Sequence, residues 1–110
     1  MGEDGWTAAI GLEELGERAP TRVSVDGGDV LLVRDGDRIF AVGNRCTHQG
    51  APLHRGPVRF SGSLATVQCP VHGSTFGLED GRVMRGPAMQ PIPAYDARVN
   101  GDTVEIRPRA

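Results

Sequence analysis

The amino-acid sequence places all of its cysteines and histidines in one short segment. The two cysteines and three histidines lie between Cys46 and His72, and the residues on either side contain neither type. In a reducing compartment two cysteines rarely form a structural disulfide, so their thiols are expected to serve another purpose. This clustering predicts a metal site, and a chain that builds one here must fold so that two separate loops meet.

The candidate ligands form two pairs. The first is Cys46-Thr47-His48, and the second, Cys69-Pro70-Val71-His72, follows after residues 49–68. Two thiolates and two imidazoles suit either one tetrahedral zinc ion or the two irons of a [2Fe-2S] cluster. Paired ligands of a single zinc ion usually have at least two residues between them, and Cys46 and His48 have one. The spacing therefore favours iron, with a zinc-stabilised interaction module as an alternative.

Short strands and tight turns are predicted outside this segment. The chain has 16 glycines and 8 prolines in 110 residues, which indicates many turns. Runs rich in β-branched residues predict strands at 22–25, 30–33, 38–42, 82–84, 94–99 and 103–106, and residues 12–16 suit a single helical turn. Asn100-Gly101 predicts a hairpin between the last two strands. An all-β fold in one domain, residues 1–110, is therefore expected.

The two motifs resemble those of the Rieske [2Fe-2S] proteins. The resemblance rests on four stretches: Cys46-Thr47-His48-Gln49-Gly50-Ala51-Pro52-Leu53, Cys69-Pro70-Val71-His72-Gly73-Ser74-Thr75-Phe76, Gly77-Leu78-Glu79-Asp80-Gly81, and Gly86-Pro87-Ala88 with Pro91 and Pro93. It implies antiparallel sheets in a small sandwich or barrel, with a cluster-binding subdomain of two loops at about 45–56 and 67–78 and a proline loop at about 86–93. It also implies one [2Fe-2S] cluster, with Cys46 and Cys69 on the inner iron and His48 and His72 on the outer iron.

Two departures from the family pattern narrow the subtype. Respiratory-chain Rieske proteins join their two loops by a disulfide, and Ala51 and Val71 stand in those positions here. Those proteins also carry a serine and a tyrosine whose hydroxyls bind cluster or ligand sulfur and raise the reduction potential. This chain has Ser74, an expected cofactor contact, but Phe76 replaces the tyrosine. The pattern resembles soluble bacterial Rieske ferredoxins, with a longer connection whose extra residues we place near 58–63.

Charge excludes some partners and suggests others. The net charge of −2 argues against nucleic-acid binding, and an acidic start without a long apolar run argues against a membrane and for a cytoplasmic location. The protein is expected to be a monomer. Residues 45–78 contain Arg45, Arg55 and Arg59 and no carboxylate. This segment is expected to form a cationic docking patch, unless the loop composition is merely uneven. Docking would then rest on an apolar rim of Leu53, Val71 and Pro87.

The resemblance implies an electron carrier and not an enzyme with its own substrate site. It would pass one electron from a reductase to an oxygenase or a similar terminal enzyme. Two alternatives within this scaffold are the small subunit of an assimilatory nitrite reductase and a domain whose cluster senses redox state. His54, which has no second candidate ligand beside it, is expected to be an exposed loop residue, with a docking or proton-linked role as the alternative.

Overall fold

The computed structural model describes residues 5–109, and almost all of its regular structure is β-strand. The strands are β1 (Thr7–Gly11), β2 (Thr21–Val25), β3 (Gly28–Asp35), β4 (Arg38–Gly43), β5 (Val58–Ser61), β6 (Leu64–Gln68), β7 (Thr75–Gly77), β8 (Val83–Arg85), β9 (Ala94–Asn100) and β10 (Thr103–Pro108). Two 3-10 turns, η2 (Leu12–Glu14) and η3 (Leu53–Arg55), complete it. The predicted all-β class is confirmed. No helix within residues 5–109 has the length and apolar character that crossing a membrane requires.

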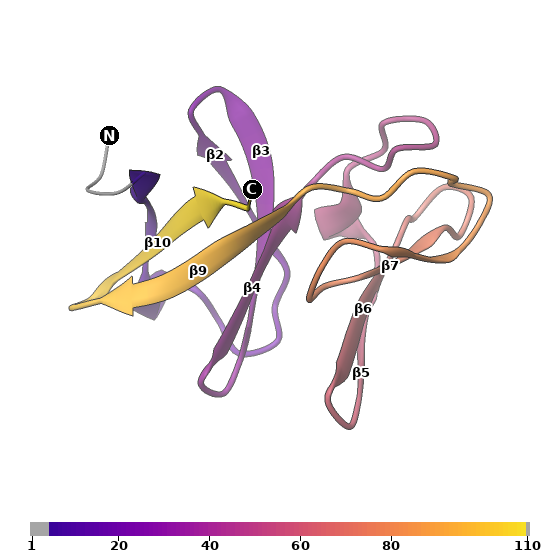
Figure 1. Ribbon diagram of the computed structural model, residues 1–110. Coiled ribbons are helices and arrows are strands. Elements are labelled where there is room, and N and C mark those ends of the chain that lie inside the picture. Colours follow the sequence, from indigo (N-terminus) through magenta and orange to yellow (C-terminus); the bar gives the residue numbers. More distant parts are fainter. Residues whose placement is uncertain (1–4, 110) are drawn as a thin grey trace.

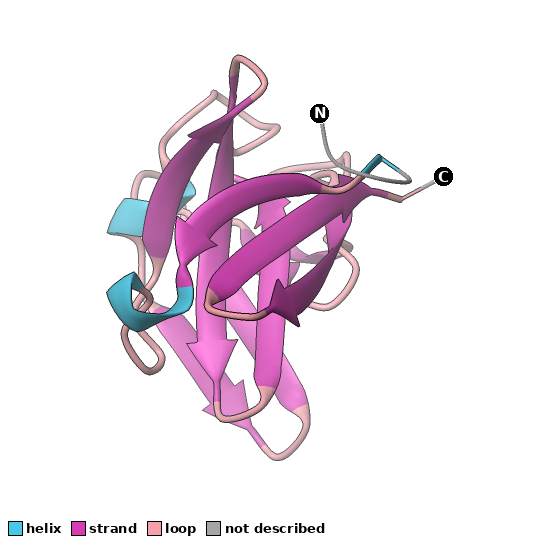
Figure 2. Ribbon diagram, turned by 90° about the vertical axis from the view of Figure 1, so that its left-hand side faces the viewer, coloured by secondary structure: helices cyan, strands magenta, loops and turns pink. Residues whose placement is uncertain are grey.

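The strands form two antiparallel sheets, seen on the left and right of Figure 1. The larger sheet has the order β1-β10-β9-β4-β3-β2, and its terminal strands β1 and β2 approach each other, so it curves almost into a barrel (Figure 2). The smaller sheet has the order β5-β6-β7-β8. The chain crosses to the smaller sheet after β4 and returns to β9 through residues 86–93 (Figure 1).

Strand β3 lies between two apolar cores. Its uninterrupted run from Val30 to Val33 is fully buried, as a strand covered on both faces requires. Because side chains alternate along a strand, Val30 and Leu32 pack with the barrel interior. Leu31 and Val33 pack on the opposite face, in a core that includes residues of the smaller sheet. The same strand therefore joins both halves of the protein.

A charged cluster also joins the two sheets. The carboxylate of Asp35 accepts hydrogen bonds from Arg18 Nε at 2.9 Å and from Arg38 Nη2 at 2.7 Å. The Arg18 guanidinium lies 4.6 Å from the ring centroid of Phe60 on β5, and Arg38 Nη1 donates to the carbonyl of Ser63 at 3.0 Å. Asp35 therefore orients two arginines that contact the β5–β6 hairpin.

The strand pattern predicted most of the larger sheet and little of the smaller one. The predicted strands correspond to β2, β3, β4, β8, β9 and β10, and the predicted helical turn corresponds to η2. Strand β1 of the larger sheet and strands β5, β6 and β7 of the smaller sheet were not predicted. Residues 58–63, where we placed the additional length, form β5 and the turn into β6.

Candidate metal centre

The two candidate ligand loops have the same backbone hydrogen bonds. In the first, the Gly50 amide donates to the Cys46 carbonyl at 2.7 Å, and the Cys46 amide donates to Ala51 at 2.9 Å. In the second, the Gly73 amide donates to the Cys69 carbonyl at 3.2 Å, and the Cys69 amide donates to Ser74 at 2.7 Å. Both glycines have a positive φ, +76° and +80°, which residues with a side chain rarely adopt. The cysteines therefore occupy equivalent positions in two equivalent turns.

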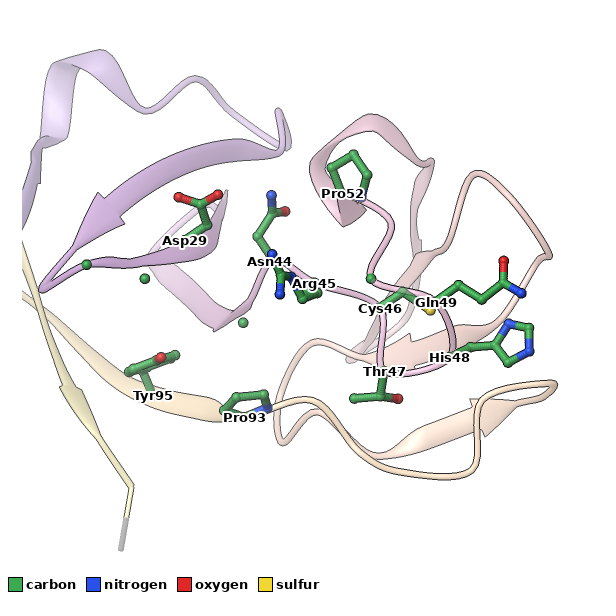
Figure 3. Close-up of a pocket in the computed structure, with 14 residues that line it drawn as sticks. Asp29, Asn44, Arg45, Cys46, Thr47, His48, Gln49, Pro52, Pro93 and Tyr95 are labelled. Carbon is green, nitrogen blue, oxygen red and sulfur yellow. The ribbon is translucent and has the colours of Figure 1, made fainter.

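The four predicted ligands divide by exposure. Cys46 and Cys69 are 1% and 4% exposed and belong to the core between the sheets, and both are free thiols. His48 and His72 are exposed, and their ring centroids lie 5.1 Å apart. In Figure 3 the ring of His48 lies at the outer end of the first loop, on the side away from Asp29 and Tyr95. The structure thus brings the two loops together, with the thiols on the inner side and the imidazoles at the surface.

The side chains are not gathered around one point. Within the part of the chain that the structure describes, no three His, Cys, Asp or Glu side chains form a group suited to a single ion. A [2Fe-2S] cluster with both cysteine and histidine ligands needs two cysteine sulfurs at one iron and two histidine nitrogens at the other. A buried thiol pair beneath an exposed imidazole pair fits this requirement.

The proline loop, residues 86–93, is held against both ligand loops. Thr47 Oγ1 donates to the carbonyl of Gln90 at 2.6 Å. Ser74, which is fully buried, accepts a hydrogen bond from the Ala88 amide at 2.9 Å. The hydroxyl hydrogen of Ser74 therefore stays available to a further acceptor. Sequence reasoning did not select Thr47, although it stands between two predicted ligands.

The positions that distinguish the subtype lie in different surroundings. Ala51 is buried and Val71 is 57% exposed. Phe76 is fully buried in the core that also contains both cysteines. Leu53 is also fully buried, so its predicted place on an exposed apolar rim is wrong. Val71, Pro87 and Met89 are exposed, and Met89, on the proline loop, is 88% exposed.

The prediction that His54 is an exposed loop residue is wrong. Its ring is half-buried, and Nδ1 lies 2.9 Å from Nδ2 of Asn44. Burial is the main cause that lowers the pKa of His54 below its usual 6.5, and Arg22 and Arg55 lower it further. Asn44 was not selected from the sequence, because an asparagine after a strand carries no signal that separates it from an ordinary turn residue.

The arginines around this centre differ from those of the larger sheet. Among residues 5–109, every arginine of the larger sheet and its connections has an ion pair, whereas Arg45, Arg55, Arg59 and Arg85 have none within 4.0 Å. All four are exposed. Arg45 also lines an open groove between the first loop and the β2–β3 turn, with Asp29 and Tyr95 (Figure 3). We call these four residues the cationic face.

Sequence comparison relates the chain to both small and large proteins. A family model described as the Rieske [2Fe-2S] domain matches residues 5–96. The ferredoxin component of the naphthalene 1,2-dioxygenase system from Pseudomonas aeruginosa is 30% identical over 101 residues, covering 92% of this chain and 93% of that protein. Apoptosis-inducing factor 3 of Mus musculus is 33% identical over 85 residues, 77% of this chain, which spans only 13% of that relative's length.

Solved structures share the whole fold. The ferredoxin of carbazole 1,9a-dioxygenase from Nocardioides aromaticivorans IC177 superimposes with a TM-score of 0.87 at 31% identity, covering 96% of this chain and all of that one. A Mycobacterium tuberculosis protein assigned as the small subunit of an NADH-dependent nitrite reductase gives 0.82 at 33% identity, covering 96% of each chain. With its paired turns and its match to the family model over residues 5–96, this chain belongs to the Rieske [2Fe-2S] domain family, and its cofactor is one [2Fe-2S] cluster.

Proposed function

We propose that Cys46 and Cys69 bind the inner iron of the cluster and that His48 and His72 bind the outer iron. The burial of both thiols and the exposure of both imidazoles support this division. The equivalent hydrogen bonds of the two turns support it further, because they present the two cysteines in the same way. Ser74 is proposed to donate its remaining hydrogen to a cluster or ligand sulfur, since its oxygen already accepts from Ala88.

The protein is proposed to carry one electron from a reductase to an oxygenase or a similar terminal enzyme. A bound cluster of this type exchanges one electron, and two ferric irons, two sulfides and two thiolates sum to a neutral oxidised state. The observation that carries the proposal is the exposed His48–His72 pair, with rings 5.1 Å apart, above buried thiols. A partner that contacts these rings shortens the path to the cluster. The full-length match to the two dioxygenase ferredoxins favours this role.

The cationic face is proposed as the docking surface for both partners. Its four arginines are exposed, and none has an ion pair within 4.0 Å among the described residues, so no carboxylate of that part of the chain neutralises their charge. Val71, next to His72 in the sequence, and Met89 on the proline loop add exposed apolar side chains. A partner of complementary shape would present carboxylates around its own redox centre, because such charges steer association.

The small subunit of a nitrite reductase is the second candidate function. The similarity to the Mycobacterium tuberculosis protein favours it, and such a subunit would stay bound to a large partner. A carrier that shuttles between enzymes would instead be a free monomer. For either role we propose a cytoplasmic location, which suits the two free thiols.

Stopped-flow electron transfer tests the carrier role. Reduced protein is mixed with a terminal oxygenase of the dioxygenase type, and reoxidation is followed in the visible spectrum. Fast transfer that slows as salt rises is expected, since charges are screened within about 8 Å at physiological ionic strength. Arg45→Glu should slow transfer roughly tenfold at low salt without changing the spectrum. Arg109→Glu, a charge reversal at an exposed arginine directly after β10, is the control.

Two outcomes would overturn this function. Rates that respond neither to salt nor to Arg45→Glu would refute docking through the cationic face. Co-purification in a stable complex with a nitrite reductase large subunit, with no transfer to any oxygenase, would favour the second candidate.

A further inference from the structure

Asn44 closes the base of the first ligand loop. It is 3% exposed and directly follows β4. Its backbone carbonyl accepts from the Leu53 amide at 2.8 Å, and its side-chain Oδ1 accepts from the His54 amide at 2.7 Å. Its own amide donates to the Asp29 carbonyl at 3.1 Å, which anchors it to β3. One buried residue therefore joins the start of the loop to its end and to the larger sheet.

The contact between the Asn44 side chain and the His54 ring requires a neutral imidazole. Oδ1 of Asn44 faces an amide donor, so the group that faces the His54 ring at 2.9 Å is the Nδ2 amide. This amide group can only donate, so Nδ1 of His54 must accept and carry no proton. The ring is then the tautomer with its proton on Nε2. A proton on Nδ1 would place two donors against each other and break the contact.

The charged groups around the ring also oppose its protonation. Arg22 on β2 and Arg55 on η3 both disfavour a positive imidazole, and Asp29 on β3 opposes them more weakly. Burial acts in the same direction as the arginines and more strongly. The ring therefore stays neutral at pH 7, the state that the contact with Asn44 needs.

We propose that His54 is a positioning residue for the cluster: its neutral ring, held by Asn44, keeps the first ligand loop closed, and acid opens the loop by breaking that contact. This inference rests on the proposed function, because the loop carries the proposed ligands Cys46 and His48. No disulfide joins the two ligand loops, and the Asn44–His54 pair is a non-covalent closure of one of them. Cluster retention should therefore depend on a histidine that does not bind iron.

The first test is the rate of cluster loss under a chelator, followed by bleaching of the visible absorbance between pH 5 and pH 7.5. His54→Ala should lose its cluster about three- to tenfold faster than wild type at pH 7.5, the range that one net hydrogen bond represents. The two rates should converge as the pH falls through the pKa of His54, which burial and the two arginines hold below 6.5, because the wild-type ring then becomes protonated. A ratio that does not change with pH would overturn the proposal, and so would equal rates throughout.

Asn44→Asp should remove the acid sensitivity of cluster loss. The carboxylate keeps an acceptor for the His54 amide and offers its second oxygen to a protonated Nδ1, so acid should no longer accelerate cluster loss. If this variant is as acid-labile as wild type, the pair does not control the loop.

Amide hydrogen exchange separates this inference from the proposed function. The amides of Leu53 and His54 should lose protection, corrected for intrinsic rates, as the pH falls in wild type but not in Asn44→Asp. This readout does not depend on redox partners or on which side chains bind iron. A protein that purifies without a cluster would refute the proposed function, and unchanged protection at these two amides would refute the role of His54.

Discussion

Replacing Gly56 with alanine is expected to force the two ligand loops apart. Gly56 is buried at the end of the first loop, and its φ of −93° is open to any residue. Space is the constraint, because a Cβ here would fall well inside 3.0 Å of the Gln68 carbonyl oxygen and 3.2 Å from Cδ of Pro70. These two residues flank the proposed ligand Cys69. A methyl group added at residue 56 of the first loop would therefore press against the second loop.

The magnitude follows from two opposing effects. Overpacking of a tight interior costs about 1–3 kcal/mol, and the stiffer unfolded chain returns about 0.4–1 kcal/mol, so a net loss of about 1–2 kcal/mol is expected. For a domain of this size, that corresponds to a fall in Tm of roughly 4–16 °C. Thermal unfolding followed by circular dichroism, with the visible absorbance per protein as a second measure, checks both stability and cluster content.

Gly16→Ala is the matched control for Gly56→Ala. Gly16 is exposed, its backbone is not left-handed, and an added Cβ would meet only the Ala19 Cβ at an ordinary 3.5 Å. This variant should melt at or slightly above the wild-type temperature. If Gly56→Ala melts like Gly16→Ala and keeps its full cluster content, the close approach of the two loops at Gly56 does not support the centre.

Three further substitutions test other parts of the molecule. Cys69→Ser should abolish cluster incorporation, and a normal visible spectrum in that protein would refute the ligand assignment. We expect a reduction potential in the lower part of the Rieske span of about −150 to +300 mV, and Ser74→Ala should lower it. The same substitution leaves the buried Ala88 amide without its acceptor, which should cost about 1–3 kcal/mol of stability. A potential that does not change in voltammetry would mean that Ser74 donates to no sulfur. Hydrogen bonds from Arg38 and Arg18 lower the pKa of Asp35 in the folded protein below its usual 3.8. As the pH falls, the unfolded chain therefore binds a proton at Asp35 before the folded protein does, and the folded protein loses stability until the pH has passed through its own lower pKa. Asp35→Asn should therefore lose less stability in acid melts than wild type, and parallel curves would show that Asp35 makes no such contribution.

The ligand motifs and the larger sheet could be predicted from local patterns. Cys46-Thr47-His48 and Cys69-Pro70-Val71-His72 are short enough to be recognised along the chain, and each is followed by the glycine that its turn needs, Gly50 and Gly73. Strands β2, β3 and β4 have clear β-branched runs between glycine-rich turns, and Asn100-Gly101 marks the last hairpin. The apolar run of β3 was the clearest strand signal, because a strand that is buried on both faces has apolar residues at successive positions.

The smaller sheet and the contacts that support the centre depend on residues far apart in the chain. Strand β7 has three residues, and its pairing with β6 and β8 gives it order that its composition does not indicate. Whether His54 is exposed depends on Asn44, ten residues earlier, and the acceptor of the Ala88 amide is Ser74, fourteen residues earlier. The close packing at Gly56 likewise involves Gln68. Residue type and spacing are enough to indicate what can bind a metal, whereas burial and hydrogen-bond partners arise only when distant segments pack, because desolvation and close contact are properties of the folded chain.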